Sequence, residues 1–201
     1  MRARFVLTPY SDPAGGLDWD EQTPLHCERV SKGITDHFSN DLQFNLHETD
    51  HGIGADWPTI TLELIGTATG LFFGIPALHK KFREAISEWK QIKNKLVKFI
   101  SWIEKNEPVY SYSIEVAFYD AINYLSDLEN VDELELTDIK EILGKSGTIE
   151  VTFESAPIAY YFFVFTDNAE WLHIFLYDSK MRRHFYKKVP LDPLLEGSQS
   201  V

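Results

Sequence analysis

The sequence has a single cysteine, Cys27, among its 201 residues. One thiol cannot form a disulfide within the chain, and it cannot supply a paired-cysteine metal site. The segment from Met1 to Leu7 is too short for a secretory signal, because Pro9 follows at once. We therefore expect a cytoplasmic protein with a reduced thiol.

Motifs that carry a known chemistry are equally scarce. The sequence contains no glycine-rich phosphate loop and no G-x-S-x-G nucleophile elbow. The uncharged run 64–78 has fifteen residues, and a membrane-spanning helix needs about 20. Its glycines Gly66, Gly70 and Gly74 are spaced by four, which on a helix gives a smooth ridge. We interpret this run as part of a buried helix and argue against integral membrane insertion.

Basic residues are outnumbered, with 19 Lys and Arg against 31 Asp and Glu and a formal net charge of −12. This balance argues against a nucleic-acid-binding protein. The charges are also unevenly distributed. Residues 77–105 carry eight basic and three acidic side chains, whereas residues 113–143 carry nine acids and one lysine. Such opposite blocks can pair within the fold or attract a partner.

The hydrophobic pattern predicts an α+β fold in one domain, residues 1–195, followed by a disordered tail at 196–201. A strand and loop region at 1–56 precedes a helical region at 57–145. A four-stranded antiparallel meander is expected at 146–190. Its strands are expected at 149–154, 158–165, 171–177 and 183–189.

The strongest single prediction is an amphipathic helix at 77–105. Its apolar stripe has spacings of three and four residues and comprises Phe82, Ala85, Trp89, Ile92, Leu96, Phe99 and Ile103. A helix at 57–73 is expected to precede it, so that residues 57–105 form a helical hairpin packed with further helices on the sheet. The further helices are expected at 25–38, 114–128 and 137–143, and additional strands at 2–8 and 42–46.

The basic amphipathic helix at 77–105 leaves three alternatives open. It can pack within the fold with its lysines in water, form a homodimer through its stripe, or lie on an anionic membrane surface. Packing within the fold is the interpretation that we favour.

Residues 47–51, with His47, Glu48 and His51, match the pattern H-E-x-x-H. The motif resembles that of the zincin metallopeptidases, in which two histidines on one helix face bind zinc and the glutamate acts as general base. Gly54 agrees with the metzincin extension of that pattern, but Trp57 stands where the third ligand is expected and cannot bind metal. The resemblance implies a zinc-dependent hydrolase with His47 and His51 as metal ligands and Glu48 as the catalytic residue.

The local pattern before His47 favours a strand instead of a helix. On a strand, His47 and His51 share a face but lie about 13 Å apart, too far for one metal ion. We therefore interpret this segment as a polar loop and assign neither a catalytic residue nor a cofactor. His26 beside Cys27 is also not interpreted as a catalytic dyad, because neighbouring side chains point in different directions.

The leading hypothesis from the sequence is an acidic, non-enzymatic binding protein of immunity or inhibitor type. Such a protein uses negative charge to engage a basic protein partner, and electrostatic steering speeds the association. The expected partner-binding residues are Glu115, Asp120, Asp127, Glu129, Asp132, Glu133, Glu135 and Asp138. The alternatives are the zinc hydrolase and a membrane-surface or oligomerising module built on residues 57–105.

Overall fold

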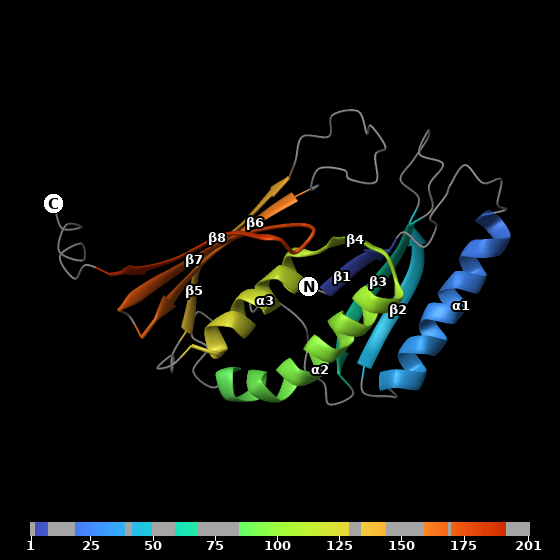
Figure 1. The fold of residues 1–201 in the computed structure, drawn as a ribbon, viewed down its shortest axis with the longest axis horizontal. Coiled ribbons are helices and arrows are strands. Elements are labelled where there is room, and N and C mark those ends of the chain that lie inside the picture. Colours follow the sequence, from blue (N-terminus) through green and yellow to red (C-terminus); the bar gives the residue numbers. More distant parts are fainter. Residues whose placement is uncertain are drawn as a thin grey trace. The chain divides into compact units, whose positions relative to one another are not determined.

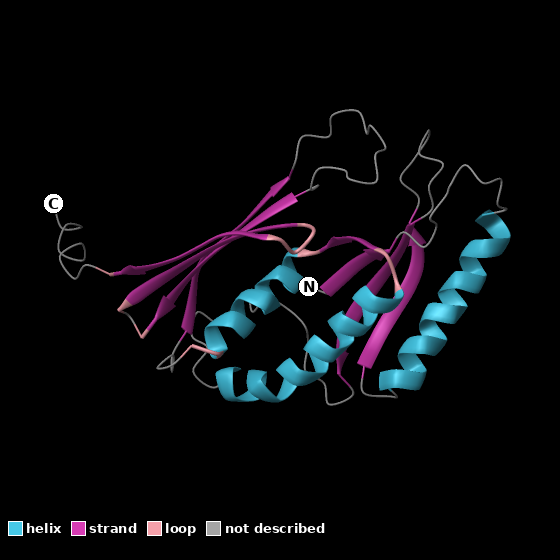
Figure 2. Cartoon of the chain, viewed as in Figure 1, coloured by secondary structure: helices cyan, strands magenta, loops and turns pink. Residues whose placement is uncertain are grey.

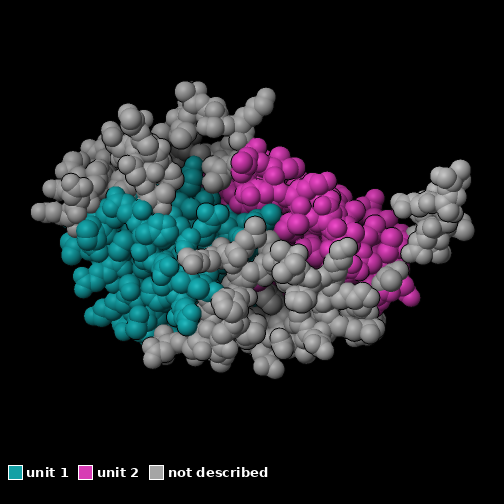
Figure 3. Space-filling model, turned by 180° about the vertical axis from the view of Figure 1, so that it is seen from behind, with its two compact units in different colours: residues 1–75, 94–116 teal, residues 76–93, 117–201 magenta. Residues whose placement is uncertain are grey.

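The computed structural model describes residues 3–7, 19–38, 42–49, 59–67, 85–128, 134–143, 159–168 and 170–191. The chain divides into two compact units (Figure 3). Unit 1 comprises residues 1–75 and 94–116, and unit 2 comprises residues 76–93 and 117–201. The single domain that the sequence predicts stays a prediction, as does the tail at 196–201, which lies outside the described residues.

Unit 1 contains a four-stranded antiparallel sheet with the strand order β2-β3-β1-β4. The strands are β1 (Ala3–Leu7), β2 (Leu42–Thr49), β3 (Thr59–Thr67) and β4 (Val109–Tyr112). Helix α1 (Trp19–Phe38) follows β1, and helix α2 (Ala85–Asn106), of which residues 94–106 belong to unit 1, precedes β4 (Figure 1). This βαββαβ connectivity is that of the ferredoxin-like fold.

Every second residue of the two central strands, β1 and β3, contributes an apolar side chain to the core of unit 1. Ala3, Phe5 and Leu7 in β1 are buried, and so are Ile60, Leu62 and Leu64 in β3. Phe5 and Leu62 are register partners, so both sets face the same side of the sheet. The ring of Phe99 in α2 packs edge-on against Phe5 at 5.6 Å between centroids. One sheet face is therefore sealed by a helix.

A glycine allows α1 to approach α2 closely. A β-carbon placed on Gly33 of α1 would lie 2.8 Å from the indole ring of Trp102 in α2. The same indole contacts Phe38 at 5.9 Å between ring centroids, and Phe38 also packs on Phe99. The missing side chain at Gly33 therefore makes room for a tryptophan.

Replacing Gly33 with alanine tests this packing. In an exposed helix the change would stabilise by about 1 kcal/mol, but overpacking costs about 1–3 kcal/mol. We expect Gly33→Ala to lower the free energy of unfolding by about 1 kcal/mol in urea titration, because the Trp102 ring must move. Asp36→Ala, on an exposed turn of the same helix, serves as the control and is expected to change stability little. A more stable Gly33→Ala variant would contradict the close approach.

Unit 2 contains the four-stranded antiparallel meander β5-β6-β7-β8. The strands are β5 (Leu134–Leu143), β6 (Ala159–Asp167), β7 (Trp171–Asp178) and β8 (Arg183–Pro190). Helix α3 (Ile114–Ser126), of which residues 117–126 belong to unit 2, packs on one face of this sheet (Figure 2).

Aromatic rings form most of the layer between α3 and the meander. Phe118 of α3 lies between Phe163 and Phe165 of β6, with ring centroids 5.9 and 5.8 Å away. Tyr124 packs edge-on against Phe175 of β7 at 5.9 Å. At about 1.5–3 kcal/mol for each large side chain removed from water, this layer is the main stabilising contribution in unit 2.

The structure confirms the α+β class and the C-terminal four-stranded meander. The strands expected at 158–165, 171–177 and 183–189 form within a few residues of the expected bounds, as does the helix expected at 114–128. The short helix expected at 137–143 is wrong, because these residues belong to strand β5. Thr137 lies at a β-bulge and does not cap a helix. The strand expected at 149–154 lies outside the described residues.

The helix expected at 57–73 is also wrong over its described part, since residues 59–67 form strand β3. Threonine and isoleucine favour a strand, and Ile60, Leu62 and Leu64 alternate with polar residues. Gly66 therefore lies in a strand. The helical hairpin expected at 57–105 is also wrong, because its first arm contains strand β3 and only its second arm, α2, is a helix. Gly70 and Gly74 lie outside the described residues.

The amphipathic helix expected at 77–105 is confirmed over its described part as α2, which ends at Asn106. Leu96, Phe99 and Ile103 of its apolar stripe are buried. The C-terminal half of the stripe thus packs within the fold, as favoured above. Among the described helices, none is long and apolar enough to cross a membrane.

Candidate functional site

The acidic residues expected to bind a partner differ in how accessible their side chains are. Asp127 at the end of α3 is exposed, and Glu135 and Asp138 on β5 are half-buried. Glu115 is buried, only 4% exposed, and does not belong to the surface. Asp120 accepts a hydrogen bond from the Tyr177 hydroxyl at 2.8 Å. Glu129, Asp132 and Glu133 lie outside the described residues.

Strand β5 carries the acidic side chains that remain accessible in unit 2. Within the described part of the chain, β5 is an edge strand that pairs with β6 alone. Glu141, beyond Glu135 and Asp138, is exposed on the same strand. Asp138 forms an ion pair with Lys140 at 3.2 Å, and both side chains remain partly open to water. The candidate binding surface, called the β5 edge below, consists of Asp127, Glu135, Asp138 and Glu141.

The opposite edge strand, β8, is basic, with Arg183, Lys187 and Lys188 exposed. Two neighbouring basic side chains, Arg182 and His184, bind a carboxylate at the turn between β7 and β8. The buried carboxylate of Asp178 accepts hydrogen bonds from the side chains of Arg182 and His184, each at 2.7 Å. Burial acts to raise the pKa of Asp178, but these hydrogen bonds outweigh it and hold the pKa below its usual value. Arg182 and His184 therefore stabilise the turn.

The first residues of the zincin-like motif lie on a strand. His47 and Glu48 belong to β2 and are exposed, and they do not form the helix on which a zincin motif depends. His51 lies outside the described residues, so the zinc hydrolase stays an untested alternative, and the polar loop expected here is a strand at His47 and Glu48. Among the described residues, no three histidine, cysteine, aspartate or glutamate side chains are grouped so that they could hold a metal ion.

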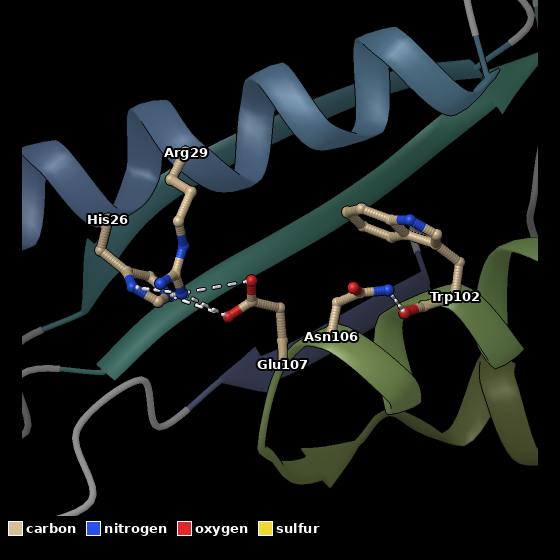
Figure 4. Close-up of polar contacts among 5 residues, drawn as sticks. All are labelled: His26, Arg29, Trp102, Asn106 and Glu107. Carbon is tan, nitrogen blue, oxygen red and sulfur yellow. Dashed lines mark hydrogen bonds and ion pairs between the residues drawn. The ribbon is translucent and has the colours of Figure 1, made fainter.

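His26 does not pair with Cys27. It pairs with Glu107, the residue that follows the end of α2. Its Nε2 lies 3.0 Å from Oε2 of Glu107, which also accepts a hydrogen bond from Arg29 Nη2 at 3.2 Å (Figure 4). His26 and Glu107 are buried, whereas the Arg29 side chain is 64% exposed. Burial, followed by the nearby charge of Glu48, raises the pKa of Cys27. The thiol is therefore not activated as a nucleophile.

The three-residue cluster of His26, Arg29 and Glu107 connects α1 to the end of α2. Leaving a buried carboxylate unpaired is costly, so the two basic groups from α1 fix the position of Glu107. Figure 4 shows both side chains reaching from α1 toward Glu107, while Asn106 donates to the backbone oxygen of Trp102. Together with the Gly33–Trp102 contact, the cluster holds the two helices in register.

A second buried polar cluster lies in unit 2. In His173 of β7, Nε2 lies 3.3 Å from the carboxylate of Asp167 and Nδ1 lies 3.0 Å from the hydroxyl oxygen of Tyr186. Lys188 Nζ is 4.0 Å from the same carboxylate. Burial and, to a smaller extent, Lys188 lower the pKa of His173, although Asp167 acts to raise it. The imidazole is therefore held neutral, and it is completely buried, so no substrate can reach it.

Neither buried cluster is visible in the sequence. His26 and Glu107 are separated by 81 residues, and their pairing depends on the packing of two helices. Asp167 and His173 flank a hairpin, which brings them together once the turn is formed. For the second cluster, the only signal in the sequence is a polar residue, His173, within the otherwise apolar strand 171–177. This signal does not show which residue the histidine contacts.

Comparisons with protein-family models, with curated proteins and with solved structures find no match for this chain. The ferredoxin-like connectivity of unit 1 hosts many unrelated functions and carries no functional argument by itself.

The lowered pKa of His173 predicts how stability depends on pH. In the unfolded chain a histidine titrates near pH 6.5, so below that pH the unfolded state binds a proton that the folded state excludes. We therefore expect the free energy of unfolding to fall as the pH is lowered from 7 to 5. Chemical denaturation at several pH values measures this slope.

His173→Gln is expected to flatten the slope, whereas His47→Gln, which removes an exposed histidine of β2, provides the control. An unchanged slope in His173→Gln would contradict the assignment of a neutral, buried imidazole.

Proposed function

We propose that the protein is a non-enzymatic, cytoplasmic binding protein of inhibitor or immunity type, which uses the β5 edge to engage a basic protein partner. The observation that carries the proposal is the position of the accessible acids. Asp127, Glu135 and Glu141 lie at the end of α3 and along an edge strand, with the basic strand β8 on the far side of the same sheet. Such a separation of charge orients a charged partner as it approaches.

Three of the five described histidines are engaged with carboxylates, which supports a non-enzymatic role for them, whereas His37 and His47 are exposed. His26 and His173 are buried and bound to carboxylates, and His184 is bound to Asp178. A general base must reach the proton that it removes, and the two buried imidazoles are only 8% (His26) and 0% (His173) exposed. The single cysteine, whose pKa is raised, supports a reducing compartment and offers no nucleophile.

Complementary charge acts mainly on the rate of association. We therefore expect the protein to bind a basic nuclease-type partner with an association rate that falls about tenfold between 50 and 300 mM salt. Biolayer interferometry against a panel of purified basic nucleases measures this rate.

A charge-reversal pair separates the β5 edge from general acidity. The double variant Glu135→Lys/Glu141→Lys is expected to slow association by about tenfold, because it reverses two charges of the edge. Glu28→Lys, on an exposed position of α1, is the control and is expected to change the rate little. Salt-independent association, or an equal effect of Glu28→Lys, would contradict the proposed surface.

A further inference from the structure

The two faces of the C-terminal meander differ in what covers them. On the face that carries α3, the side chains Tyr161, Phe163, Phe165, Phe175 and Tyr177 are buried. The alternate residues point to the other face, and each of these apolar side chains keeps some exposure. We call this second face the outer face. Its apolar residues are Ile142, Tyr160, Phe162, Val164, Leu172, Ile174, Leu176, Phe185 and Val189.

The outer face is apolar where water would favour polar residues. Sheets with one face in water normally alternate apolar and polar side chains. Here Phe185 is 44% exposed and Ile142 is 54% exposed, and no described helix of unit 2 packs on this face (Figure 2). A contiguous apolar patch of this kind marks an interaction site.

The central row of the outer face is self-complementary. Strand register places Asp138, Val164, Ile174 and Lys187 side by side across the four strands. The row thus begins with an acid on β5, ends with a base on β8, and is apolar in between. A two-fold axis parallel to the strands reverses the order of the strands and keeps the position along them. Asp138 then faces Lys187 of the second copy, and Val164 faces Ile174.

The neighbouring row obeys the same symmetry. It consists of Lys140, Phe162, Leu176 and Phe185. Under the same two-fold axis, Lys140 faces the exposed ring of Phe185 of the second copy, an arrangement that suits a cation–π contact. Phe162 faces Leu176. Two adjacent rows therefore favour one and the same partner.

We propose that the outer face pairs with the outer face of a second copy of this chain, so that two meanders form a β-sandwich. Sheets stacked in this way lie about 10 Å apart with their strands within about 30° of each other. The present intrachain ion pair between Asp138 and Lys140 is partly exposed, so Asp138 can bind Lys187 of the second copy instead. This surface is distinct from the helix at 77–105 that the sequence offered for a homodimer.

The size of the outer face indicates a weak dimer. Four strands about 4.8 Å apart and about eight residues long cover roughly 500 Å² on each copy. The total, about 1,000 Å², lies below the range of stable interfaces and in that of weak, transient ones, so we expect a reversible dimer.

Charge exchange across the two-fold axis provides the test, with sedimentation velocity between 1 and 200 µM as the measurement. We expect the natural chain to dimerise over this range. Lys187→Asp and Asp138→Lys should each raise the dissociation constant about tenfold, because each replaces two attractive pairs with two repulsive ones. Lys98→Asp, which changes an exposed lysine of α2, is the matched control and should dimerise like the natural chain.

Mixing the two single variants separates the proposed geometry from a general loss of folding. In a heterodimer of Lys187→Asp with Asp138→Lys, acid again faces base at both positions, so the mixture should regain the dimer. A monomeric natural chain at 200 µM would overturn the proposal, as would a dimer that Lys187→Asp leaves intact or a mixture that stays monomeric. Asp138 also belongs to the β5 edge, but none of these measurements involves a basic partner, so a failed dimer and a failed association with a basic partner remain distinguishable.

Discussion

The aromatic layer between α3 and the meander is the interaction on which unit 2 depends. Phe118 and Tyr124 of the helix meet Phe163, Phe165 and Phe175 of the sheet. Because side chains alternate along a strand, sealing these rings on one face directs every second residue to the other face. In β6 and β7 those residues are also apolar, so the stability of one face is accompanied by exposure on the other.

The sheet of unit 1 differs in the residues that point away from its helices. Its sheet directs Phe5, Leu62 and their neighbours toward the helices, and the described residues between them in β1, β2 and β3 include Arg4, Asn45, Thr61 and Glu63. The alternation of apolar and polar residues there is ordinary for a sheet with one face covered. This contrast with the apolar outer face of unit 2 underlies the proposed pairing of two copies.

The buried polar clusters hold neighbouring elements of each unit together. His26, Arg29 and Glu107 fix two helices against one another. Asp167, His173 and Tyr186 fix three successive strands. In each cluster a buried carboxylate is paired with a buried imidazole, and such a polar contact helps to specify a single packing arrangement.

The sequence predicted what depends on local periodicity. The apolar runs at 158–165 and 171–177 and the stripe of Leu96, Phe99 and Ile103 depend on neighbouring residues, and the structure has them in the expected elements. Residues 59–67 were misassigned because the glycine-spaced uncharged run that begins at Leu64 was interpreted as part of a helix, although Ile60 and Leu62 alternate with polar residues and the segment pairs with β1 and β2. Glu115 was placed on the surface because charge alone does not show burial. The partner of His26 could not be predicted, since it depends on the packing of α1 against α2.

The central claim is that the two faces of the meander differ, one sealed within the fold and one available to a partner. Hydroxyl-radical footprinting with mass spectrometry measures this directly, because the oxidation rate of a ring follows its exposure. In dilute protein, the account predicts faster oxidation of Phe162 and Phe185 than of Phe163 and Phe165, and protection of the first pair as the concentration rises. Equal protection of all four rings at every concentration would contradict it.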